Sequence, residues 1–217
     1  MCEFSTKTRK LLDNVLKAMA KSLELDEDSF IRQFGDRPLL DARFNNYPCC
    51  LRPDLVIGVK PHSDSSGLTI ILPDKDVEGL QVMKDGVWAK VITNPHALIV
   101  NMGDQMEVNA LFTNSYCRSF LHLYAIVFMT NYSLIMQIIS NGIFKSPLHR
   151  VVTNTEKHRI SIAMFYTPEG ETEIGPADGL LSDTRPRLYK TLKSKDYLGI
   201  FFPRYLLGKT TIHLVRM

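Results

Sequence analysis

The feature that most constrains the fold of this chain is a succession of short β-forming runs separated by turn residues. Turn signals such as Asp85-Gly86 and Asn94-Pro95 stand between the runs. Many short strands at close spacing are typical of a sandwich or jelly roll, and not of a parallel α/β sheet. We therefore predict a mainly β fold with flanking helices. The runs are LVIGVK, GLTIIL, GLQVM, VWAKV, ALIVNM, LHRVV and RISIAMFY.

Helical patterns occur at the two ends of the chain. Apolar residues recur at helical spacing over residues 6–24, with lysines between them, which predicts an amphipathic helix. A helical turn is expected over residues 28–34. The segment from residue 196 is predicted to be helical until Pro203 and Gly208 interrupt it.

Composition and charge exclude several classes of protein. The 217 residues are 45% apolar and 23% charged, which is the balance of one ordinary globular domain. The net charge of +3 comes without a dense basic run, so we expect no nucleic-acid partner. The four cysteines have no CxxC spacing and the first residues, MCEFSTKTRKLL, do not resemble a secretory signal, so a cytoplasmic location is expected. We also expect a monomer.

One apolar stretch raises the question of membrane insertion. Residues 119–144 contain no Asp, Glu, Lys or Arg and are long enough to span a bilayer. Polar residues are scattered through the stretch, however, and no topology signal flanks it. We therefore expect no membrane partner, and anchoring through this stretch is the least favoured hypothesis.

A His-x-Asp pattern opens one of the predicted strands. Side chains at positions i and i+2 project from the same face of an extended chain, so His62 and Asp64 converge on one point. The pattern alone is weak, because a histidine beside an aspartate is often only a hydrogen-bonded pair. His149 begins a later strand, and together the three supply the two-histidine, one-carboxylate face used by non-haem iron(II) oxygenases.

A second i, i+2 pair follows ten residues after His149. Arg159 and Ser161 share one strand face, and the planar fork of arginine holds a carboxylate by two parallel hydrogen bonds. Taken alone, the pair is better explained as a solvated strand edge. Combined with the predicted metal ligands, it indicates a dicarboxylate anchored beside a metal. His158 is predicted to lie on the opposite face, and Trp88 and Phe165 to be packing residues.

These residues lie in stretches that resemble the plant 2-oxoglutarate- and iron(II)-dependent dioxygenases, the family that contains flavonol and anthocyanidin synthases and codeine demethylase. The resemblance covers nearly everything from residue 36 onward except one block. The matching stretches are FNNYPCCLRPDLVIGVKPHSDSSGLTIILPDKDVEGLQVMKDGVWAKV, NPHALIVNMGDQMEV, SNGIFKSPLHRVVTNTEKHRISIAMFYTP and RPRLY.

The resemblance implies a fold, a metal site and a co-substrate site. The fold would be a double-stranded β-helix, that is, a cupin-like jelly-roll barrel. The implied iron(II) ligands are His62, Asp64 and His149. The implied 2-oxoglutarate residues are Arg159 and Ser161 for the distal carboxylate, with Tyr47 and Asn45 of the N-x-Y-P pattern completing the pocket.

The resemblance also implies a reaction. Such enzymes use O₂ to convert 2-oxoglutarate to succinate and CO₂, while a small substrate is hydroxylated, desaturated or demethylated, and ascorbate commonly supports them. We expect the substrate to be a plant flavonoid, alkaloid, terpenoid or hormone. Its identity cannot be inferred from these residues.

Two departures from the family pattern motivate an alternative. The block at 109–138 has no counterpart in the family; without its 30 residues, Asp64 and His149 are 55 positions apart instead of 85. We expect residues 1–36 to be a helical remnant of a longer N-terminal support region, and residues 37–217 to form the interrupted jelly-roll domain. The alternative to an active oxygenase is therefore a catalytically inactive, truncated or mis-spliced form.

Overall fold

A computed structural model describes residues 2–94, 96–101, 134–146 and 148–217. Residues 109–133 of the predicted insertion lie outside the described residues. The elements along the chain are α1 (Cys2–Ser22), η1 (Ile31–Phe34), β1 (Leu39–Tyr47), β2 (Ile57–His62), β3 (Leu68–Leu72), β4 (Leu80–Lys84), β5 (Val87–Lys90), β6 (Ile99–Asn101), α4 (Leu134–Ile139), β7 (His149–Val152), β8 (Arg159–Thr167), β9 (Glu173–Ile174), η2 (Asp178–Leu180), β10 (Leu192–Lys193), α5 (Ser194–Leu206) and η3 (Ile212–Val215).

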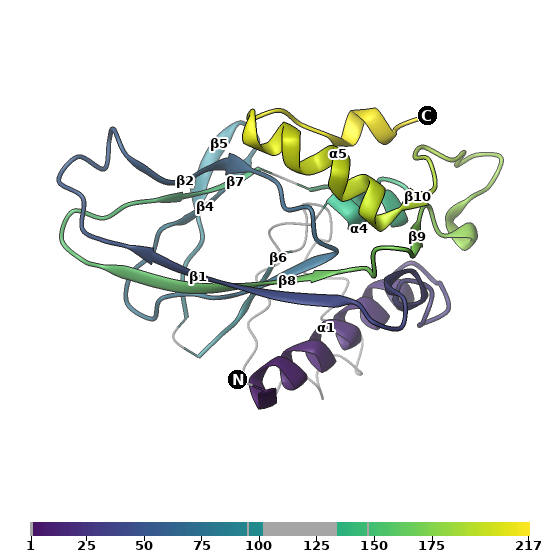
Figure 1. The fold of residues 1–217 in the computed structure, drawn as a ribbon, viewed down its shortest axis with the longest axis horizontal. Coiled ribbons are helices and arrows are strands. Elements are labelled where there is room, and N and C mark those ends of the chain that lie inside the picture. Colours follow the sequence, from purple (N-terminus) through teal and green to yellow (C-terminus); the bar gives the residue numbers. More distant parts are fainter. Residues whose placement is uncertain (1, 95, 102–133, 147) are drawn as a thin grey trace.

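Two four-stranded antiparallel sheets form the body of the molecule (Figure 1). The first has the strand order β1-β8-β3-β6 and the second has the order β2-β7-β4-β5. Each of the seven β-forming runs contains a strand. The longest pairing, β1 with β8, involves a strand that the sequence pattern did not predict, because β1 is mostly exposed and lacks apolar alternation.

The side chains of the first sheet alternate between two apolar clusters. Ile71 and Ile99 face inward and pack in a cluster between the two sheets, whereas their neighbours Ile70 and Val100 belong to a second cluster on the outer face. The inner cluster comprises Tyr47, Ile71, Leu80, Val82, Val91, Ile99, Val151 and Ala163. This alternation decides which side chains of β8 and β3 can reach the space between the sheets.

Helix α1 covers the outer face of the first sheet (Figure 1). Leu12, Leu16 and Met19 are buried in the outer cluster, which confirms the predicted amphipathic helix. The hydroxyl of Tyr166 donates a hydrogen bond of 2.7 Å to a carboxylate oxygen of Asp13. Burial of the phenol is the main cause of a raised pKa of Tyr166, and the hydrogen bond to Asp13 raises this pKa further, so the hydroxyl keeps its proton and donates it.

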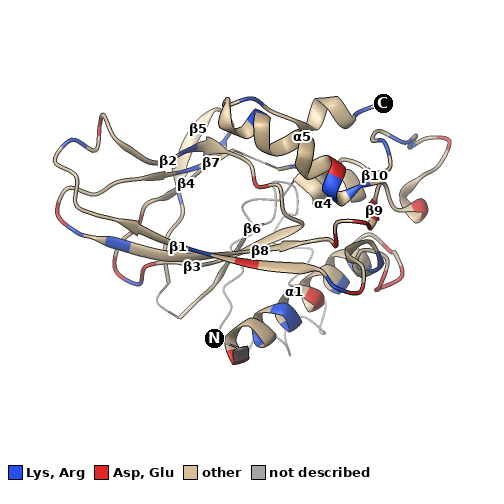
Figure 2. Ribbon diagram, viewed as in Figure 1, with Lys and Arg blue, Asp and Glu red and all other residues tan. Residues whose placement is uncertain are grey.

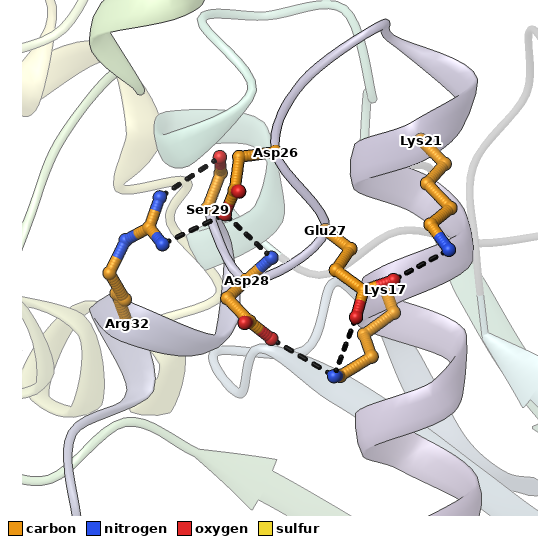
Figure 3. Close-up of polar contacts among 7 residues, drawn as sticks. All are labelled: Lys17, Lys21, Asp26, Glu27, Asp28, Ser29 and Arg32. Atoms are coloured by element: carbon orange, nitrogen blue, oxygen red, sulfur yellow. Dashed lines mark hydrogen bonds and ion pairs between the residues drawn. The ribbon is translucent and has the colours of Figure 1, made fainter.

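A polar cluster fixes the turn between α1 and η1 (Figure 3). The ammonium group of Lys17 lies 3.2 Å from a carboxylate oxygen of Glu27 and 3.0 Å from one of Asp28, and Lys21 pairs with the other oxygen of Glu27. These groups are partly exposed, so solvent screening leaves each pair with only a small contribution to stability. Their shared partners favour one conformation of the turn that leads into η1.

Helix α5 continues through a proline that we expected to interrupt it. Pro203 lies inside the helix Ser194–Leu206, so that prediction was wrong. The ring is exposed on the solvent side. The helix instead ends before Gly208, which has a φ of +68° and therefore adopts the left-handed conformation that glycine tolerates.

Helix α4 contains the last five residues of the predicted insertion at 109–138. Four of these five residues, 134–138, are buried in the outer cluster. The amide of Leu134 donates to the backbone carbonyl of Asp64 at 3.0 Å. These five residues are therefore part of the core of the fold.

Positively and negatively charged residues are both distributed over helices, strands and loops (Figure 2). Along α1, blue and red bands follow one another on the ribbon. Among the described residues, no helix has the length and apolar character needed to cross a membrane.

We expect substitution of Gly67 to destabilise the fold. A Cβ atom at Gly67 would lie 2.1 Å from the Phe34 ring, which is buried and stacked on Tyr166. Gly67→Ala should lower the free energy of unfolding by about 1–3 kcal/mol through overpacking. Gly199→Ala is the matched control, because its Cβ would meet nothing within 4 Å in α5, and should raise stability by about 0.5–1 kcal/mol. Urea denaturation measures both, and equal effects would contradict the packing argument.

Candidate metal centre

Strand pairing brings the three predicted metal ligands together. His62 ends β2 and pairs directly with His149, the first residue of β7. Their ring centroids are 4.2 Å apart. The Nε2 atoms of both rings lie 3.5 Å from the same carboxylate oxygen, Oδ1 of Asp64. This is the cluster of His and carboxylate groups among the described residues that could hold a metal ion.

The carboxylate of Asp64 is held by a short hydroxyl chain. Thr69 donates to Oδ2 of Asp64 at 2.8 Å, and Ser66 lies 3.0 Å from the Thr69 hydroxyl. Asp64 is 7% exposed. Burial raises the pKa of this carboxyl, but the charge and hydrogen bonds of His149 and His62 outweigh burial and hold the pKa well below its ordinary value. Asp64 is therefore a carboxylate with Oδ1 turned toward both imidazoles.

The neighbouring residue Lys60 orients His62. The backbone carbonyl of Lys60 lies 2.8 Å from Nδ1 of His62. A carbonyl only accepts, so Nδ1 carries a proton, and Nε2 is the nitrogen that can ligate a metal once its own proton is lost. The Lys60 ammonium donates to the carbonyl of Tyr205 at 2.8 Å, and the Tyr205 ring meets the His62 ring edge to face at 5.6 Å. Strand β2 thus connects the candidate ligand to the end of α5.

The pairing of β1 with β8 places the four other predicted site residues in the cavity that contains the metal ligands. Tyr47 pairs with Arg159 and Asn45 pairs with Ser161. All four line this cavity between the sheets. The guanidinium carbon of Arg159 lies 5.2 Å from the Tyr47 ring centroid, and Nη1 of Arg159 donates to the Ser161 hydroxyl at 3.4 Å.

Arg159 is a buried cation that forms no ion pair with a carboxylate among the described residues, although the charge of Asp74 acts on it. It is 3% exposed, its Nε has no hydrogen-bond partner in the described part of the chain, and burial lowers its pKa. Burying an unpaired charge is costly, and the cost falls when an anion binds beside it. Gly79 packs behind the side chain, since a Cβ there would lie 3.0 Å from Cδ and 3.1 Å from Nε of Arg159. The lack of a side chain at residue 79 thus sets the position of the guanidinium.

Other predicted positions divide as follows. Phe165, expected to be a packing residue, lines the cavity with the metal ligands. Trp88 packs under Arg150, whose guanidinium lies 4.2 Å from its ring centroid. His158 is exposed and bonds to Asn46 outside the cavity, as predicted.

Sequence reasoning missed Thr69 and Arg43. Arg43 lines the cavity next to Asn45 and Tyr47 on alternate positions of β1, so i, i+2 spacing could have found it. Thr69 bonds to Asp64 from the next strand. Its position in a β-forming run gave no sign of that contact.

Comparison with known proteins identifies the class. Residues 39–168 match the model of the 2OG-Fe(II) oxygenase superfamily, and the chain belongs to this family. The chain is 37% identical over 196 residues to Jasmonate-induced oxygenase 2 of Arabidopsis thaliana, covering 90% of this chain and 45% of that protein. It is 36% identical over 214 residues to Codeine O-demethylase of Papaver somniferum, covering 99% of this chain and 51% of that protein.

A solved structure confirms the predicted fold. The crystal structure of JOX2 in complex with 2OG, Fe, and JA superposes with a TM-score of 0.77 at 31% identity, covering 99% of this chain and 55% of that one. The two sheets are therefore the predicted double-stranded β-helix, and the family uses Fe(II) and 2-oxoglutarate. The chain spans about half the length of the curated relatives it matches.

Loss of one histidine should remove metal affinity. We expect His149→Ala to weaken binding of Fe(II), or of Co(II) as a spectroscopic substitute, because one of three inward-facing ligand atoms is lost. Removing a residue that only orients a metal ligand lowers metal affinity roughly 10–100-fold. Removing His149 itself should lower the affinity by more than that. Trp88→Phe is the control and should leave affinity unchanged. Isothermal titration and circular dichroism measure affinity and folding; equal loss of affinity in both variants would indicate unfolding instead.

Proposed function

We propose that this chain is an iron(II)- and 2-oxoglutarate-dependent oxygenase that oxidises a small plant metabolite. The observation that carries the proposal is the placement of an unpaired, buried arginine in the same cavity as a cluster of two histidines and one carboxylate. The substrates named for the relatives, such as codeine, support the class of a small organic molecule. They do not select one compound.

His62, Asp64 and His149 are the proposed ligands of iron(II). The tautomer of His62 is fixed by the Lys60 carbonyl, and Asp64 is ionised and held by Thr69. Two neutral nitrogens and one carboxylate oxygen suit a non-haem iron(II) centre with open positions. Iron(II), when bound, supplies the oxidative chemistry that couples conversion of 2-oxoglutarate and O₂ to succinate and CO₂ with oxidation of the substrate.

Arg159 and Ser161 are the proposed partners of the distal carboxylate of 2-oxoglutarate. The guanidinium can donate two parallel hydrogen bonds to a carboxylate, and the Ser161 hydroxyl can add a third. Tyr47 and Asn45 border the same space from β1. The free volume between these side chains is about 50 Å³, so the co-substrate must contact all of them closely or displace some on entry.

An active site is favoured over the inactive alternative, because an inactive form has no need to keep these groups together. Arg159 would otherwise burden the fold with a buried charge that has no ion-pair partner among the described residues. A cytoplasmic location and a monomeric state stay predictions from the sequence.

Succinate release is the direct test of the proposal. We expect the chain, supplied with Fe(II), ascorbate and 2-oxoglutarate, to release succinate, as should a version that lacks residues 109–133. Residues 134–138 stay in this version because they belong to the core. Release by the deleted version alone would show that the block inactivates the enzyme. No release by either folded version would contradict the proposal.

Replacing Arg159 should separate co-substrate binding from metal binding. Arg159→Lys keeps the charge but loses the planar fork, so the KM for 2-oxoglutarate should rise roughly tenfold or more. Fe(II) affinity should stay the same. Arg150→Lys is the matched control, since Arg150 lies outside the cavity against Trp88 and Gln81. Equal KM values for the two variants would exclude the proposed role of Arg159.

A further inference from the structure

A second cavity is also lined by His62. Its volume is about 320 Å³, within the range of roughly 300–1,000 Å³ typical of small-molecule sites. The walls come from the end of β2, from α4 and from α5 with the segment that follows it, and these three elements lie side by side in Figure 1. His62 lines both this cavity and the one that contains the metal ligands.

The charged side chains that line this second cavity are all positive. Lys60, Lys145 and Lys209 line it, and none of its described lining residues is an aspartate or glutamate. Lys145 and Lys209 are exposed, and neither forms an ion pair within the part of the chain that the structure describes. Lys60 is bound to backbone carbonyls of α5, which leaves its charge uncompensated. An anion would therefore be attracted to this cavity.

Two hydroxyls in the walls have no hydrogen-bond partner among the described residues. They are the buried side-chain oxygens of Ser146 and Thr211. Thr211 is 1% exposed. A buried hydroxyl without a partner is costly, so a nearby acceptor would stabilise it. A carboxylate has two acceptor oxygens and a charge opposite to that of the lysines.

The remaining walls are apolar and partly aromatic. The rings of Phe201 and Tyr205 are stacked at 5.6 Å between centroids on α5. Leu134 of α4 and Ile212 of η3 stand with them among the lining residues. Such walls suit a flat or compact apolar body.

We propose that this cavity binds a small molecule with an apolar body and a carboxylate, the carboxylate being held by Lys145, Lys209 and the Thr211 hydroxyl. The cavity is separate from the space assigned to 2-oxoglutarate. The occupant is either the organic substrate or an effector, since His62, a candidate metal ligand, lines both cavities. Binding does not require that the chain turn over 2-oxoglutarate.

The test compares an acid with its neutral counterpart. Binding of 2-naphthoate and 2-naphthamide to the full chain is measured by equilibrium dialysis. We expect the acid to bind more tightly than the amide. The double variant Lys145→Gln, Lys209→Gln should weaken the acid roughly tenfold and leave the amide unchanged. Thr211→Val, which keeps the shape of the side chain, should also weaken only the acid.

The matched control is Lys84→Gln with Lys90→Gln, two exposed lysines of the β4–β5 hairpin that do not line this cavity. Failure of the acid to bind, equal binding of acid and amide, or equal loss in the control variant would each overturn the proposal. If the acid binds as expected, recovery of oxidised acid together with succinate assigns the cavity to the substrate. A change in succinate release without oxidised acid assigns it to an effector.

Discussion

The register between β2 and β7 is the constraint on which the site depends. His62 and His149 are far apart in the chain, yet they are direct partners across this pair. Because side chains alternate between faces, a slip of one residue would turn one imidazole away from the other. The irregularities between Ile57 and His62 are confined to β2, and β7 is held on its other side by β4. The metal centre is therefore fixed by backbone hydrogen bonds as well as by the side chains that form it.

The first sheet carries the co-substrate side of the same cavity by the same principle. Its strands β1 and β8 pair without interruption over nine residues each, which fixes Arg159 opposite Tyr47 and Ser161 opposite Asn45. The two sheets together bring the candidate metal ligands and the buried side chain of Arg159 into one cavity. Helix α1 stabilises this arrangement from outside, because it buries the outer face of the first sheet and leaves the inner face for polar groups.

The sequence predicted most strands and the grouping of the candidate ligands for physical reasons that are local. Alternation on an extended chain is enough to put His62 with Asp64 and Arg159 with Ser161. Three features were beyond such reasoning. Strand β1 is exposed over most of its length, so it has no apolar signature. Thr69 of β3 bonds to Asp64 in the connection before that strand, and its place in a β-forming run does not indicate this contact. The burial of α4 in the core, with the bond from Leu134 to the carbonyl of Asp64, depends on tertiary packing that the low charge of this stretch does not reveal.

Gly79 packs against the buried arginine, and this contact limits how the site can change. A Cβ atom at residue 79 would lie 3.0 Å from Cδ of Arg159 and 3.0 Å from the carbonyl oxygen of Val152. Any larger residue here would therefore force the arginine side chain or the backbone at Val152 to shift. The position of the guanidinium thus depends on a residue that does not itself line the cavity.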